Sequence, residues 1–168
     1  MTEPVWYREA KRWLGTKEIV GPQHSPTIMG WIKNLGPKVL GIVVNDDETP
    51  WCGTFVSYCM KTAGLPSPPI AVRAKSWLTY GRQLNGPRLG CILVFTRTGG
   101  GHCGFYDGED ATHYHVLGGN QSNSVSVTRI AKDRLSPGGM RWPIGPALPP
   151  AKVVKKSPGN LKPSTNEA

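Results

Sequence analysis

The stretch DDETPWCGTFVSYCMKTAG, residues 46–64, decides how the rest of the chain is interpreted. From Cys52 onward its apolar side chains recur at helical spacing and form one continuous face, which predicts a helix. Gly64 is suited to end this helix, and Pro66 prevents its continuation. Because Pro50 fits the N-terminal boundary, Cys52 is expected at or beside the first helical turn.

The segments on either side of this helix differ in character. Further short helices are expected at residues 4–14, at about 25–34 and at 71–80. Beyond residue 89, short runs rich in β-branched and aromatic residues are separated by glycines, which predicts an antiparallel sheet of about five strands. Helices followed by strands predict an α+β fold in which N-terminal helices pack on the sheet.

The composition indicates one globular domain followed by a tail. Hydrophobic residues make up 38% of the 168 residues, and a chain of this length can bury a core without metals or disulfides. Residues 146–168 are rich in proline and lysine and hold four lysines against one acidic residue. We therefore expect a domain over residues 1–145 and a disordered basic tail over residues 146–168.

Charge and cysteine usage restrict the partners and the compartment. The net charge of +9 favours anionic partners such as nucleic acid, anionic lipid or an acidic bacterial envelope. No apolar run is long enough to span a membrane, and residues 1–15 lack the apolar core of a signal peptide. The cysteines form no CxxC pair, so free thiols are expected rather than a disulfide framework.

A cysteine at the start of a helix is well placed to be reactive, although a buried core residue is the commoner role at such a position. The free N–H groups of the first turn favour the thiolate and can stabilise an oxyanion. Such a nucleophile needs a histidine as base and a third group that orients the imidazole. His102 opens a predicted strand after TRTGGG, and Asn120 ends the next strand. Cys52, His102 and Asn120 are therefore the candidate catalytic residues.

The other cysteines and histidines have simpler interpretations. Cys59 lies deeper on the same helical face as Cys52 and is expected in the core. Cys91 and Cys103 are expected to be buried strand thiols. The remaining histidines are interpreted as surface residues, and no required metal or cofactor is expected.

The order of these motifs resembles a known family. PWC at a helix start, GHCGFY opening a strand and VLGGNQ closing the next resemble the CHAP and NlpC-type cell-wall peptidases, which are papain-like cysteine hydrolases. The resemblance covers about residues 5–143 and is strongest to a phage and prophage subgroup with ETPWC and GGNQ. The chain departs from that subgroup at Cys91, where GDI is commoner than GCI, and at Cys103, where HVGFY is commoner than HCGFY.

The resemblance implies a papain-like domain that hydrolyses peptidoglycan, as an endopeptidase or an N-acetylmuramoyl-L-alanine amidase. In this family pattern Cys52 is the nucleophile, His102 is the general base and Asn120 matches the third, variable position. If Asn120 faces away, its neighbour Gln121 is the alternative.

The same resemblance assigns further residues to the substrate cleft. Trp51 and the backbone N–H of Cys52 are expected at the cleft and the oxyanion hole, and Glu48 is expected to contribute a hydrogen bond there. Gln121 is included among these substrate-binding candidates. Packing is the alternative role for Trp51.

The expected setting is that of a phage endolysin. Such a protein acts as a monomer, stays in the host cytoplasm until a holin-type pore releases it, and then attacks the wall in the periplasm. The alternatives with the same chemistry are a virion-associated lysin and a secreted antibacterial amidase effector. A non-catalytic basic binding module is a distant alternative, because the basic residues are scattered and no nucleic-acid motif is recognisable.

Overall fold

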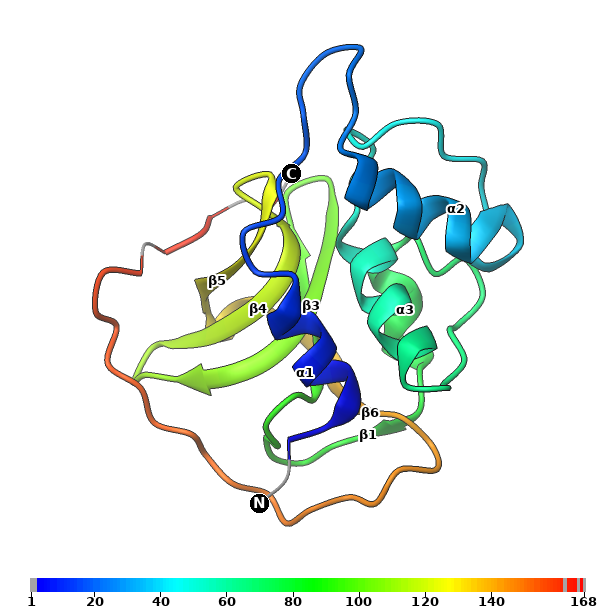
Figure 1. The fold of residues 1–168 in the computed structure, drawn as a ribbon. Helices are drawn as coiled ribbons and strands as arrows, with labels where there is room; N and C mark the ends of the chain where they lie inside the picture. Colours follow the sequence, from blue (N-terminus) through cyan, green and yellow to red (C-terminus); the bar gives the residue numbers. More distant parts are fainter. Residues whose placement is uncertain (1–2, 162, 166, 168) are drawn as a thin grey trace.

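Helices precede strands along the chain, as the sequence predicts, so the α+β class is confirmed. The computed structural model describes residues 3–161, 163–165 and 167 (Figure 1). The helical elements are α1 (Val5–Arg12), α2 (Pro26–Leu40), α3 (Cys52–Thr62) and the 3-10 helices η1 (Ala74–Thr79) and η2 (Lys132–Arg134). The strands are β1 (Arg82–Gln83), β2 (Ile92–Arg97), β3 (Gly100–Glu109), β4 (His113–Gln121), β5 (Ser124–Ala131) and β6 (Leu135–Trp142). Within the described residues, no helix has the length and apolar character that crossing a membrane requires.

Among the residues that the structure describes, the sheet has six antiparallel strands in the order β1-β6-β2-β3-β4-β5. The additional strand, β1, has two exposed residues and therefore no apolar pattern that a sequence could reveal. A tight turn at Gly99, which has a φ of 80°, joins β2 to β3. Ser122 and Asn123 both have positive φ and form the two-residue turn between β4 and β5. These turns fix the register of the strands that carry His102 and Gln121.

Helix α3 lies between the sheet and α2, with α1 packed against it as well (Figure 1). The predicted face is buried: Phe55, Val56, Cys59 and Met60 are fully inaccessible. The polar residues Thr54 and Ser57 in its first turns are buried too, because neighbouring elements enclose them. The start of α3 is therefore held in place from several directions.

Two predicted helices differ from those observed. Helix α2 extends to Leu40, past the expected end near residue 34, with a kink at Gly36. The helix expected at 71–80 is only the 3-10 helix η1. The first residues of the expected helix lie in a turn instead, and the N–H groups of Ala71 and Val72 bond to backbone carbonyls at the end of α2. Tertiary hydrogen bonds therefore override the local helical pattern.

The segment expected to be a disordered tail instead packs on the sheet in its described part. It runs around the outside of the sheet (Figure 1, orange to red). Val154 and Lys156 bond to the backbone of Glu109 at the end of β3, and Ser164 bonds to Arg129 of β5. Composition suggested disorder, but unpaired strand edges supply the hydrogen bonds that order this segment. Residues 162, 166 and 168 of the predicted tail lie outside the described part.

Candidate functional site

Cys52 is the first residue of α3 and is 5% exposed. The carbonyl of Trp51 accepts the first helical bond, from Phe55 N at 2.9 Å. The N–H groups of the first turn have no acceptor within the helix, so they point their partial positive charge at the helix entrance. The Cys52 sulfur therefore lies where a negative charge is favoured.

Gly53 allows the start of α3 to approach the segment 71–72 closely. A β-carbon at this position would lie 2.3 Å from the carbonyl oxygen of Ala71 and 2.6 Å from that of Val72. Such distances are far below van der Waals contact, so only glycine fits beside the candidate nucleophile. This requirement has no signature in the sequence except the glycine itself.

His102, on β3, is completely buried and is oriented by Gln121 at the end of β4. Its Nε2 lies 2.9 Å from the Oε1 of Gln121. The Gln121 amide nitrogen donates to the carbonyls of Val116 and Ser126, at 3.0 and 2.6 Å. Because both amide protons are used in this way, Oε1 must accept, and His102 must carry its proton on Nε2. The lone pair of a neutral His102 is then on Nδ1.

Cys52 and His102 form an electrostatic pair. Nδ1 of His102 has no hydrogen-bond partner of ordinary geometry among the described residues, yet the Cys52 thiol is close enough to affect its pKa. Burial opposes protonation of His102, but the contact with Cys52 outweighs it and raises the pKa. Catalytic hydrogen bonds are often long or poorly aligned before a substrate binds.

Cys103 is an unexpected neighbour of this pair. A hydrogen bond from its thiol, followed by the contacts with His102, lowers the pKa of Cys52 well below the ordinary value, although burial opposes the shift. Burial raises the pKa of Cys103, so this thiol stays protonated and acts as the donor. The sequence placed Cys103 correctly as a buried strand thiol but did not place it beside Cys52.

The other predicted site residues are not brought to the cysteine–histidine pair. The described residues show no hydrogen bond between Asn120 and His102, and Gln121 occupies that position. Trp51 is 1% exposed, and its ring packs against Trp31 in the core. Glu48 is exposed and accepts a hydrogen bond from the backbone of residue 21. Of the three residues assigned to substrate binding, Trp51, Glu48 and Gln121, it is Gln121 that forms a hydrogen bond with His102.

A cleft of about 370 Å³ opens beside Cys52. Its walls are the loop before α3, residues 72–75 and the β2–β3 hairpin, which contributes three consecutive glycines. Arg73, Lys75 and Arg97 line it, and none of the lining residues that the structure describes is acidic. The cleft therefore gives a substrate access to the sulfur through a positively charged entrance.

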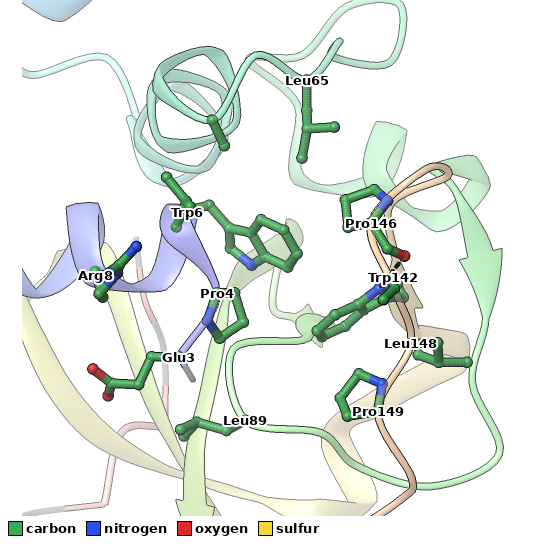
Figure 2. A pocket seen from close by; sticks show the side chains of 13 residues that line it. Glu3, Pro4, Trp6, Arg8, Leu65, Leu89, Trp142, Pro146, Leu148 and Pro149 are labelled. Atoms are coloured by element: carbon green, nitrogen blue, oxygen red, sulfur yellow. Dashed lines mark hydrogen bonds between the residues drawn. The ribbon is translucent and has the colours of Figure 1, made fainter. Parts of the chain in front are cut away.

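A second, more apolar cavity of about 480 Å³ lies away from Cys52, between α1, the end of α3 and residues 146–149. Figure 2 shows the rings of Trp6 and Trp142 on its wall. None of its lining residues in the described part of the chain is a nucleophile or a histidine. Chemistry is therefore assigned to the cleft at Cys52 and not to this cavity.

The arrangement at Cys52 can carry out nucleophilic acyl transfer. A thiolate, an adjacent imidazole and free backbone N–H groups are the parts that such a reaction needs. In the described part of the chain, no three side chains of His, Cys, Asp or Glu gather in a way that would hold a metal ion.

A scan against protein-family models found no match, and neither did searches of curated proteins and of solved structures.

The lowered pKa of Cys52 predicts alkylation in mildly acidic solution. Iodoacetamide reacts with the thiolate, which is present above the pKa, so labelling of Cys52 should persist well below pH ~8.5. In His102→Ala the profile should move to higher pH, because part of the stabilisation of the thiolate is lost. Peptide mass spectrometry between about pH 5 and pH 9 measures both profiles.

Cys59 is the internal control for this experiment. It is inaccessible, and burial raises its pKa, so it should stay unlabelled in the folded protein. Identical profiles for Cys52 in the wild type and in His102→Ala would contradict the pairing.

Proposed function

We propose that this chain is a papain-like cysteine hydrolase that cleaves an amide bond in peptidoglycan. The observation that supports the chemistry is the Gln121 amide, which fixes His102 so that Nδ1 is left for Cys52. The order of the PWC, GHCGFY and VLGGNQ motifs supports the cell wall as the substrate. The scissile bond lies in the peptide stem, in a crosslink, or between stem and sugar.

The first half of the reaction forms a thioester. The Cys52 thiolate attacks the carbonyl carbon of the amide, and the oxyanion is stabilised by the N–H of Cys52 and the first turn of α3. His102, protonated on Nδ1, gives this proton to the leaving nitrogen as the C–N bond breaks. The amine product then leaves with its proton, and the acyl group remains on the sulfur.

The second half regenerates the enzyme. Nδ1 of His102 removes a proton from a water molecule, whose oxygen attacks the thioester carbonyl. The C–S bond breaks, the carboxylic product leaves and the thiolate–imidazolium pair is restored. Gln121 holds the ring in one orientation and one tautomer through both halves.

The setting follows from the same proposal. An endolysin-like enzyme of this kind acts as a monomer on the wall in the periplasm after holin-dependent release from the host cytoplasm. A virion-associated lysin and a secreted amidase effector would use the same site, so neighbouring genes distinguish these roles. The basic surface then serves attraction to the anionic envelope and not recognition of nucleic acid.

Digestion of purified peptidoglycan sacculi tests the function. The wild type should release soluble fragments, and their masses identify the bond that is cut. Alkylation of Cys52 should stop the release. If folded, reduced protein releases nothing from sacculi of several wall chemotypes, the peptidoglycan proposal is wrong.

Gln121→Ala should lower kcat/KM for wall fragments about 10²-fold, because His102 loses its fixed orientation. Gln121→Glu keeps an acceptor for Nε2–H and should recover part of the activity, with an altered pH profile. The matched control is Asn120→Gly, which tolerates the φ of 58° at this position and should retain activity. If Asn120→Gly loses activity and Gln121→Ala retains it, Asn120 is the residue that orients His102.

A further inference from the structure

We infer that the cleft beside Cys52 binds a carboxylate of the substrate, close to the scissile amide, through Arg73, Lys75 and Arg97. This inference rests on the proposed function and adds a chemical requirement to it. A substrate whose carboxylates are masked as amides should be handled poorly.

The cations of the cleft have no carboxylate partner in the described part of the chain. Arg73 and Lys75 are exposed, and neither they nor Arg97 forms an ion pair there. Several cations outside the cleft do have carboxylate partners, as in Arg129–Asp110, Lys132–Glu109, Arg134–Glu167 and Lys156–Asp107. Like charges that share one cleft repel each other, so an anion bound between them is favoured.

The acidic residues in the loop before α3 do not line this cleft. Asp46 is bound by the backbone and the hydroxyl of Thr49. Asp47 is inaccessible and accepts from the backbone of Ser25 and from His24. Both carboxylates hold the loop in shape, and neither lines the cleft, whose described lining residues include Arg73, Lys75 and Arg97 and no acidic residue.

Contacts within the fold place these cations next to the catalytic pair. The stem of Lys75 lies against residue 101, since a β-carbon there would be 3.1 Å from Lys75 Cγ, and His102 is the next residue. Arg73 follows Val72, whose carbonyl packs on Gly53 beside Cys52. An anion held here is therefore near the sulfur.

Arg97 is held with part of its guanidinium free. Its Nε donates to the carbonyl of Gly101 at 3.0 Å, and its Nη1 donates to that of Thr98 at 3.1 Å. These bonds fix the side chain on the β2–β3 hairpin and leave further N–H groups for a ligand. A planar, partly fixed guanidinium is suited to a carboxylate.

A matched pair of soluble probes tests the inference. One is a crosslinked dimer of disaccharide tetrapeptides, which contains each of the bonds proposed for cleavage and has free carboxylates on its D-glutamate and diaminopimelate residues. The other is the same dimer with these carboxylates converted to carboxamides. We expect kcat/KM to be about tenfold higher for the acidic probe at low salt, and this preference to shrink as salt is added. Binding of both probes to Cys52→Ala, measured by calorimetry, should show the same preference without turnover.

Variants assign the preference to the cleft. Arg73→Gln/Lys75→Gln should reduce kcat/KM about tenfold for the acidic probe and hardly at all for the amidated one. Lys33→Gln, an exposed lysine on α2 outside the cleft, is the matched control and should change neither.

The outcomes separate this inference from the proposed function. Equal cleavage of both probes, or equal loss for both in the double variant, overturns the carboxylate site and leaves the hydrolase standing. Absence of cleavage with charge-dependent binding to Cys52→Ala overturns the function and retains the site. Neither cleavage nor binding overturns both.

Discussion

Cys52→Ala should remain folded and lose peptidoglycan hydrolysis by about 10⁴-fold or more. The substitution removes the sulfur at the start of α3 and leaves the helix, the cleft and the His102–Gln121 hydrogen bond in place. Without a nucleophile no thioester forms, and backbone N–H groups alone give little rate enhancement. Release of soluble fragments from sacculi measures the activity, and circular dichroism with thermal unfolding checks the fold.

Cys59→Ala is the matched control on the same helix. Cys59 is buried about two helical turns further along α3 than Cys52. Its replacement should lower the stability somewhat, but the protein should retain hydrolysis. Equal activity of Cys52→Ala and the wild type would make Cys52 a structural residue. Loss of activity in both variants would point to a general effect of α3 packing instead.

Gly53→Ala should lower the free energy of unfolding by about 3 kcal/mol or more and abolish activity. The added β-carbon meets two backbone carbonyl oxygens, which cannot rotate away as a side chain can. Either α3 or the segment 71–72 must move, and both carry residues of the cleft. Urea unfolding gives the change in stability, and the sacculus assay gives the change in activity.

Gly30→Ala separates this clash from the general effect of a helical glycine. Gly30 lies in α2, and a β-carbon there has no atom within 4 Å. Alanine should therefore stabilise the protein by about 0.5–1 kcal/mol through helix propensity. If Gly53→Ala behaves like Gly30→Ala, the close approach at the helix start is not a constraint.

The sequence predicted elements whose residues carry a local pattern. Helix α3 follows from the spacing of Phe55, Val56, Cys59 and Met60, because burial of one face imposes that spacing. The short strands follow from β-branched and aromatic runs between glycines. The two-residue strand β1 and the order of the strands depend on pairing between distant segments, which no local pattern records.

The sequence alone does not decide whether Asn120 or Gln121 orients His102. Successive residues of a regular strand face opposite sides, so Asn120 and Gln121 cannot both meet His102. The register shift between Gly118 and Gln121, with a positive φ at Asn120, decides for Gln121. A bulge of this kind comes from the pairing of β4 with β5 and has only weak signals in the sequence.

Proximity between elements could not be predicted either. The contact of Cys103 with Cys52 requires knowledge that α3 packs on β3. The cationic cleft likewise brings residues 73–75 together with Arg97 on a hairpin. No sequence motif marks these positions as neighbours.

The two segments that line the outer side of β5 also bear on the solubility of the protein. Thr16 bonds to the backbone of Val125 near one end of this edge strand, and Ser164 bonds to Arg129 further along. An uncovered edge strand is a template on which a second molecule can add its own strand, and such growth leads to aggregates. Truncation after residue 150 would expose half of this edge, so a shortened protein should precipitate at concentrations that the full chain tolerates.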